Sequence, residues 1–210
     1  MCPRIGAGFR LVLGDFNTAH LEKVAEDLSN AGYDVTTAAL DVSDKNSVDG
    51  FAKTAAALGE IAAILHTAGI SHNMGSAERI MDINLVGTAR MIEAFEPYVT
   101  RGAVGVFISS NSGYLGRALT EEETSAVATL SADALREQVG NWHIRESGEA
   151  YVLSKRANRL QVASSAARWG RKGARIVSIS PGVISTPMSK KEQETSKQMA
   201  FMIQIHLLVG

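Results

Sequence analysis

The chain has 210 residues, a formal net charge of −1 and 45% hydrophobic residues, which fits one globular domain with a sizeable core. The lysine and arginine residues form no basic cluster, so the sequence argues against a nucleic-acid or anionic-membrane partner. No apolar run reaches the roughly 20 residues of a membrane helix or has the form of a signal peptide, and we therefore expect a cytoplasmic protein. The single cysteine, Cys2, excludes an internal disulfide, and no histidine spacing indicates a metal site.

Short apolar runs alternate with helical spacing of apolar residues along the chain. This pattern predicts strands over residues 10–13, 35–40, 61–65, 104–108 and 174–179. It predicts helices between them, with the first two ended by Gly32 and Gly59 and the longest over about 77–98 and 149–169. Strands that alternate with helices predict an α/β fold, in which helices cover both faces of a parallel sheet.

One segment, residues 117–150, interrupts this alternation. Thr120 and Glu123 match a capping box and Ser131 suits the start of a second short helix, so we expect the segment to be partly helical. Two interpretations stay open, surface decoration or a lid over a substrate pocket. Its larger apolar side chains favour a hydrophobic substrate; they are Val127, Leu130, Leu135 and Trp142.

The most informative local pattern is a tyrosine and a lysine four residues apart, Tyr151 and Lys155. On a helix these positions share a face, so the phenol and the ammonium are expected to be neighbours. A free tyrosine has a pKa of about 10, and a nearby ammonium lowers it by stabilising the phenolate. The pair can therefore take a proton from an alcohol or give one to a ketone. By chance alone, the same spacing is also common on solvated helix faces.

The surrounding segments strengthen this interpretation, because ligands of open α/β sheets bind beyond the carboxyl ends of the strands. Serines follow the fourth predicted strand, at residues 109, 110 and 112. Small residues follow the third strand, where Ala68 and Gly69 allow close approach to the backbone. Asp41 follows the second strand, and Asn84 places an amide inside an otherwise apolar helix.

The order and context of these segments resemble the classical short-chain dehydrogenase/reductase family over roughly residues 5–202. The resemblance implies that Tyr151 is the catalytic acid/base and that Lys155 lowers the tyrosine pKa and holds the nicotinamide ribose. It implies that Ser110 binds the substrate oxygen and that Asn84 positions a water in a proton relay. Ser109 and Ser112 are alternatives to Ser110, and Asn84 has the alternative of bending its helix through bonds to the backbone.

The resemblance also implies a cofactor site. Asp41 and Val42 would flank the adenine, Ala68 and Gly69 would line the adenosine ribose, and Thr186 with the backbone near Ile184 would hold the carboxamide. Thr186 has the alternative of starting a helix ahead of Pro187. Asp15, at the end of the first visible strand, can bond the ribose 2′-hydroxyl and would repel a 2′-phosphate, which favours NAD over NADP.

The family opens with a strand and a glycine-rich turn that holds the pyrophosphate. Gly6-Ala7-Gly8 directly precedes the Asp15 strand and is not that turn. We therefore expect a single domain over 1–210, a Rossmann-like doubly wound sheet lacking its first and its C-terminal strand, in which the strands ending near Asp15 and Asp41 are separated from the other three.

Two hypotheses about function follow. The first is an NAD-dependent oxidoreductase that acts on a hydrophobic alcohol or ketone, as a homo-oligomer if a full-length form exists. The second is a non-catalytic remnant of this family, or a fragment, that acts only by association.

Overall fold

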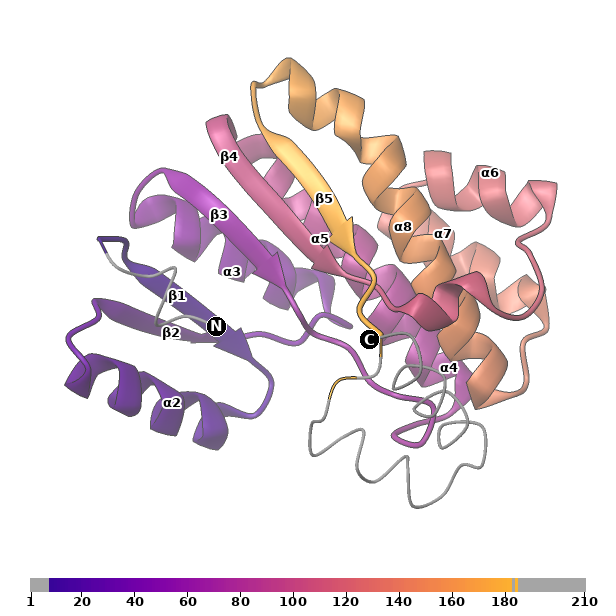
Figure 1. Cartoon of the computed structure of the whole chain (residues 1–210), viewed down its shortest axis with the longest axis horizontal. Helices are drawn as coiled ribbons and strands as arrows, with labels where there is room; N and C mark the ends of the chain where they lie inside the picture. The colour runs from indigo at the N-terminus through magenta and orange to yellow at the C-terminus, as the bar shows by residue number, and fades with distance from the viewer. Residues whose placement is uncertain (1–7, 183, 185–210) are drawn as a thin grey trace, which may run out of the picture.

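The computed structural model describes residues 8–182 and residue 184, in which five strands alternate with helices (Figure 1). The strands are β1 (Leu11–Asp15), β2 (Val35–Ala39), β3 (Ile61–His66), β4 (Val99–Ile108) and β5 (Arg175–Ile179). The longer helices are α2 (Thr18–Asn30), α3 (Lys45–Ala57), α5 (Gly87–Phe95) and α8 (Ser147–Arg171). Gly32 follows α2 with a φ of 88°, which explains why the helix ends there.

The helix predicted over 77–98 is divided into four pieces. They are α4 (Ala77–Ile80), a π-helical turn η1 (Met81–Val86), α5 and a 3₁₀ turn η2 (Glu96–Tyr98). A π-helical turn within an α-helix is rare and often lies at a functional site. This one contains Asn84, the amide that the sequence singled out.

All strand pairs are parallel, and they form two separate sheets. β1 pairs with β2, whereas β3, β4 and β5 form a second sheet in that order. The expected separation of the first two strands from the other three is confirmed. Within residues 8–182, no backbone hydrogen-bond ladder joins β1 to β3. Three residues of β3, the edge strand of the second sheet, are exposed: Ala62, Ala63 and Leu65. The gap therefore lies open rather than inside a core.

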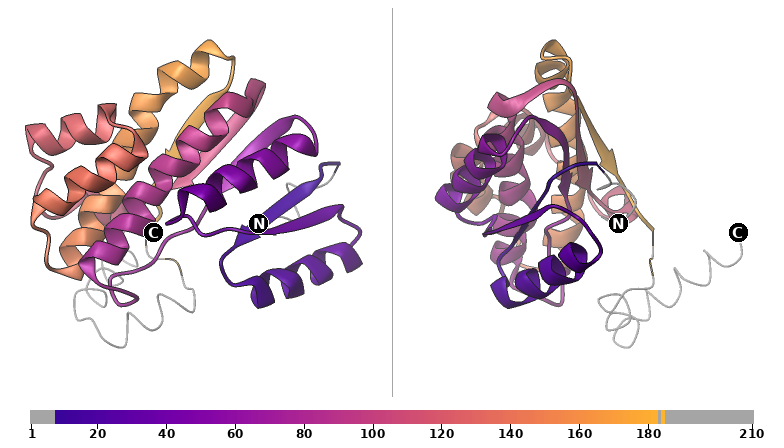
Figure 2. Two further views of the ribbon diagram at one scale, coloured as in Figure 1. Left: turned by 180° about the vertical axis from the view of Figure 1, so that it is seen from behind. Right: turned by 90° about the vertical axis from the view of Figure 1, so that its left-hand side faces the viewer.

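The main core lies on one face of the three-stranded sheet, against α3, α5 and α8 (Figures 1 and 2). Trp169 of α8 fills the space that Gly105 leaves on β4, since a Cβ there would lie 2.8 Å from its ring. On the other face, Leu65, Val177 and Ile179 are 38%, 43% and 49% exposed, and no helix of the described residues covers them. The α/β class and the parallel Rossmann-like pairing are confirmed, with helices on one face of this sheet in the part of the chain that is described.

Residues 117–150 contain two short helices, α6 (Glu121–Thr129) and α7 (Ala132–Val139), and the 3₁₀ turn η4 (Gly140–Trp142). The predicted capping box of Thr120 and Glu123 is confirmed, and Ser131 caps α7. Both helices pack on the side of α8 and η1 that faces away from the sheet (Figure 1).

No helix in the described part of the chain is both long and apolar enough to cross a membrane.

Candidate active site

Lys155 is the buried cation of the site and comes from the first half of α8. Its side chain is 7% exposed, and its Nζ donates a hydrogen bond to the carbonyl of Ile108, 3.1 Å away at the end of β4. Nζ lies 5.9 Å from the centre of the Tyr151 ring, so the predicted pair does share one helix face. Burial lowers the pKa of Lys155 to about 8. Because water does not screen a buried ammonium, its electrostatic attraction to a nearby negative charge is strong.

The serines after β4 divide into a structural and an accessible position. Ser109 is buried, and its hydroxyl donates to the carbonyl of Lys155 at 2.6 Å, which fixes the strand end against α8. Ser110 is half-buried, and its Oγ accepts from the hydroxyl of Ser112 at 2.9 Å and from the Ser112 amide at 3.2 Å. Of the three alternatives, Ser109 is therefore occupied elsewhere, and Ser110 is oriented by Ser112.

Close packing holds this serine turn against the helix. The turn η3 (Asn111–Tyr114) contains Gly113, where a Cβ would lie 2.9 Å from backbone atoms of both Lys155 and Arg156. Only glycine lets the turn approach α8 so closely. The sequence around this glycine thus determines how near Ser110 is to the tyrosine–lysine helix.

Asn84 clamps the loop that follows β3. Its Oδ1 accepts from the amide of Ile70 and its Nδ2 donates to the carbonyl of Ile70, both at 2.9 Å. A Cβ on Gly69 would lie 3.2 Å from Asn84 Oδ1 and 3.4 Å from Lys155 Nζ. The structure therefore brings together Gly69, Asn84 and Lys155, which lie far apart in the sequence.

The backbone carbonyl of Asn84 lies within the π-helical turn and meets two side-chain donors. It accepts hydrogen bonds from Thr88 Oγ1 at 2.7 Å and from Asn158 Nδ2 at 2.8 Å, and Asn84 Nδ2 lies 3.4 Å from Ser154 Oγ. Both interpretations of Asn84 remain relevant, because it bonds to backbone groups and also lies beside Lys155. Its role in positioning a water stays a prediction.

Sequence reasoning missed the polar side chains that support Asn84. Ser154 and Asn158 are fully buried on α8, three and seven residues after Tyr151. That spacing places all three on one helix face. The sequence feature that could have identified them is their polar character on the face of the helix that carries Tyr151, where apolar side chains are otherwise expected.

His66, at the end of β3, is also buried beneath the site. Its Nε2 lies 3.2 Å from Thr88 Oγ1, and its ring packs at 5.4 Å from that of Phe107. Burial, with a smaller contribution from the charge of Lys155, lowers the pKa of His66 to about 3. The histidine is therefore neutral at physiological pH and packs in the core.

The proposed cofactor residues lie at the carboxyl ends of β1, β2 and β3. Asp15 ends β1, and its carboxylate accepts from the amide of Asn17 at 2.8 Å. Asp41 is exposed while Val42 is buried, and both follow β2. Ala68 is exposed after β3, and Ile184 is 58% exposed. Thr186 lies outside the described residues.

The apolar side chains of residues 117–150, which favoured a hydrophobic substrate in the sequence, include two that belong to the core. Val127 and Leu135 are 4% and 1% exposed and pack with Leu85 of η1 in a second core cluster. Packing thus accounts for their apolar character, which carries no information about the substrate. The partly buried side chains packed against this cluster include Trp142, Ile144 and Tyr151, so the segment reaches the tyrosine, and the interpretation as a lid stays a prediction.

Within the described residues, no group of three or more histidine, cysteine, aspartate or glutamate side chains is placed to hold a metal ion.

Comparison with known proteins identifies the family of this chain. The sequence pattern of the short chain dehydrogenase family matches residues 4–129. The short-chain dehydrogenase/reductase bsc3 of Alternaria brassicicola is 35% identical over 202 residues, which cover 93% of this chain and 72% of that protein. The uncharacterized oxidoreductase YxbG of Bacillus subtilis is 26% identical over 197 residues, covering 91% of this chain and 65% of its own length.

Solved structures show the same fold. The protein gox2181 superposes with a TM-score of 0.71 at 22% identity, covering 94% of this chain and 71% of that structure. An alcohol dehydrogenase from Thermococcus sibiricus, complexed with 5-hydroxy-NADP, superposes with a TM-score of 0.62 at 22% identity, covering 86% and 68%. The sequence pattern, the fungal relative and the shared fold together show that the chain belongs to the short-chain dehydrogenase family.

Proposed function

We propose that this oxidoreductase transfers a hydride between NAD(H) and a small-molecule alcohol or ketone, with Tyr151 as the general acid/base. The observation that carries the proposal is the convergence of Lys155, Asn84 and Gly69 beside Tyr151, at the carboxyl ends of the strands. Buried polar groups that converge where an α/β sheet binds ligands favour a catalytic site over a structural one.

The residues present suit the nicotinamide half of the cofactor. The Lys155 ammonium can donate to the nicotinamide ribose hydroxyls, and Gly69, proposed to line the adenosine ribose, leaves a space beside Lys155 Nζ that a side chain would fill. When bound, the nicotinamide supplies the hydride acceptor or donor.

The protein's own groups handle orientation and the proton. Ser110, oriented by Ser112, donates to the substrate oxygen, and Tyr151 gives that oxygen a proton in reduction or removes one in oxidation. Lys155 stabilises the phenolate by its charge. Asn84 holds the loop after β3 and, as the resemblance implies, positions a water that reconnects the site with solvent.

Asp15 supports NAD as the cofactor. Its carboxylate ends β1, where it can bond a ribose 2′-hydroxyl and repel a phosphate in that position. Since NADP-type cofactors occur in the same fold, as in the Thermococcus sibiricus complex, the choice depends on this side chain. We further propose that the protein is cytoplasmic and, if a full-length form exists, a homo-oligomer. Its near-zero net charge argues against nucleic-acid or anionic-membrane partners.

The test is the variant Tyr151→Phe, which removes only the hydroxyl. We expect turnover of NADH with a panel of ketones to fall by about 10²–10⁴, the usual contribution of acid–base catalysis, while NADH affinity is unchanged. Tyr98→Phe, distant in sequence on η2, is the matched control. Turnover by Tyr151→Phe within tenfold of the parent would refute the role of Tyr151.

A second candidate function, association without catalysis, is favoured by the open gap between β1 and β3. Unpaired strand edges are templates for pairing with another chain. A thermal melt with and without millimolar NAD separates the two. A cooperative unfolding transition whose midpoint temperature rises with NAD supports the enzyme. A chain whose melting does not respond to NAD, and which co-elutes with an intact relative, supports association.

A further inference from the structure

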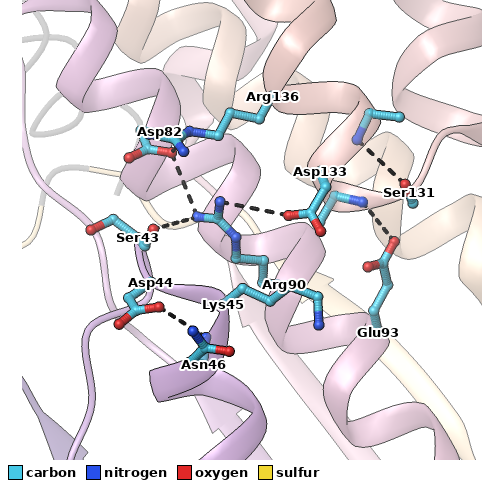
Figure 3. A network of polar contacts seen from close by, with 12 residues as sticks. Ser43, Asp44, Lys45, Asn46, Asp82, Arg90, Glu93, Ser131, Asp133 and Arg136 are labelled. Carbon is cyan, nitrogen blue, oxygen red and sulfur yellow. Dashed lines mark hydrogen bonds and ion pairs between the residues drawn. The ribbon is translucent and has the colours of Figure 1, made fainter.

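Arg90 is a buried arginine at the centre of a polar network that joins α5 to two other parts of the chain (Figure 3). It lies within α5 and is 4% exposed. Its Nη1 donates to the carbonyl of Ser43 at 2.7 Å and to that of Val42 at 3.4 Å. The same nitrogen lies 3.5 Å from Asp82 Oδ1 of η1, and Nη2 lies 4.0 Å from Asp133 Oδ1 of α7.

The first part is the loop between β2 and α3, which carries the proposed adenine-binding residues. Asp41 Oδ1 accepts from the Ser43 amide at 2.9 Å and from the Ser43 hydroxyl at 2.6 Å. Val42 is buried against Gly87, where a Cβ would come within 2.9 Å of its side chain. Arg90 holds the carbonyls of this loop, and through Ser43 its bonds bear on the orientation of the Asp41 carboxylate.

The second part is the start of α7. Glu93, one turn after Arg90 on α5, accepts a hydrogen bond from the amide of Ala132 at 2.8 Å. Asp82 Oδ1 also lies 3.1 Å from Arg136 Nε; these contacts are ionic, since that oxygen accepts no hydrogen bond of good geometry. The beginning of α7 is thereby fixed to the same helix that fixes the loop.

A buried cation at this position needs an explanation, because an apolar side chain of the same volume is often as stable or more so. The guanidinium offers what no apolar group or lysine provides, a planar fork of donors that meets several acceptors in fixed geometry. The groups that Arg90 meets here belong to the loop after β2, to η1 and to α7, which lie far apart in the sequence.

We infer that Arg90 is a positioning residue for the adenine end of the cofactor site, and that it links the loop of residues 41–44 to α7. The inference builds on the proposed function. Through this link, a displacement of α7 changes the geometry of the adenine-side loop, although α7 does not touch the cofactor site.

Hydrogen exchange tests the link directly, without cofactor. In Arg90→Met, amides of residues 41–46 and of the first turn of α7 should exchange at least tenfold faster, while those of β4 and α8 keep their protection. Arg90→Lys should give a partial effect. The exposed Arg79→Met is the matched control and should leave both segments unchanged. Unchanged exchange in residues 41–46, or loss of protection throughout the chain, would overturn the link.

Binding of ADP-ribose, followed by nuclear magnetic resonance at millimolar concentration, tests the adenine assignment. Arg90→Met should weaken ADP-ribose binding about tenfold and leave the binding of nicotinamide mononucleotide unchanged. If Arg90→Met fails to fold, Asp133→Asn, whose side chain is 58% exposed, should weaken ADP-ribose binding and loosen both segments in the same direction. Equal weakening of both ligands would overturn the assignment. Absence of any ADP-ribose binding by the parent chain would refute the proposed function, while exchange still decides the link.

Discussion

Replacing Lys155 by methionine should make the folded protein more stable while removing its activity. The side chain is buried, and burial is the cause that lowers its pKa from 10.5 to about 8. At about 1.4 kcal/mol for each pH unit, this difference corresponds to about 3 kcal/mol that the charged lysine costs the folded state at pH 7. Loss of the hydrogen bond from Lys155 to the Ile108 carbonyl destabilises the folded variant by about 1 kcal/mol, which offsets part of that gain. The expected net gain is about 2 kcal/mol.

The pH dependence distinguishes this charge effect from better packing. Folded Lys155 loses its proton near pH 8 and the unfolded chain loses it near 10.5, so the unfolded state binds more protons between these values. The parent protein therefore gains stability from this group as pH rises through that window. The advantage of Lys155→Met should disappear by pH 10.

Urea unfolding at pH 7 and pH 10 measures the effect, with the exposed Lys53→Met as control. The gain at pH 7 corresponds to a rise in Tm of about 4–8 °C for a domain of this size. A Lys155→Met protein that is less stable than the parent at pH 7, or an advantage that does not change with pH, would refute the reasoning.

Three further predictions concern other positions. Because the pKa of His66 is lowered from 6.5 to about 3, the stability it contributes is complete above pH 6.5 and is lost toward pH 3, by about 5 kcal/mol; His66→Asn should flatten that part of the acid unfolding curve. Gly113→Ala should shift the turn that carries Ser110 and lower turnover tenfold or more, whereas Gly140→Ala, with nothing within 4 Å of its Cβ, should not; equal rates would refute the packing argument. The ratio of specificity constants should favour NAD over NADP by about tenfold, and Asp15→Ser should narrow it; tighter use of NADP by the parent would show that Asp15 does not set the choice.

Periodicity predicted every strand to within a few residues except the start of β4. That strand begins at Val99, five residues earlier than expected, because Val99 pairs with Ile61 beyond a bulge. The intervening residues Thr100 and Arg101 are exposed and polar, so the apolar pattern did not extend over them. Strand pairing, which acts between distant segments, overrode the local signal.

The division of the helix around Asn84 could not be read from the sequence either. The π-helical turn depends on acceptors and donors from other elements, since Asn158 of α8 bonds the Asn84 carbonyl and Ile70 bonds its side chain. Arg90 was missed for the same reason. A single arginine in a predicted helix is expected to be exposed to solvent. Only the fold shows that the Arg90 guanidinium is buried against backbone carbonyls of the loop after β2.

What the sequence did predict were the pairs that lie within one element. Tyr151 and Lys155 share a helix face because their spacing requires it, and Thr120 and Glu123 form their capping box for the same reason. The interpretation of residues 117–150 as a lid stays a prediction, because a local apolar pattern is the same for side chains that line a pocket and for side chains that pack on a neighbouring helix. Val127 and Leu135 are of the second kind, since both are buried in the cluster that includes α8.

The most direct test of hydride transfer uses NADH that carries deuterium at both C4 positions. The chain is incubated with millimolar labelled NADH and a panel of ketones and aldehydes in ordinary water, and the alcohol products are analysed by mass spectrometry. The proposed function predicts one deuterium on the carbinol carbon of the product, with the hydroxyl proton coming from solvent through Tyr151. An alcohol without deuterium, or no alcohol from any carbonyl in the panel, would contradict hydride transfer by this chain.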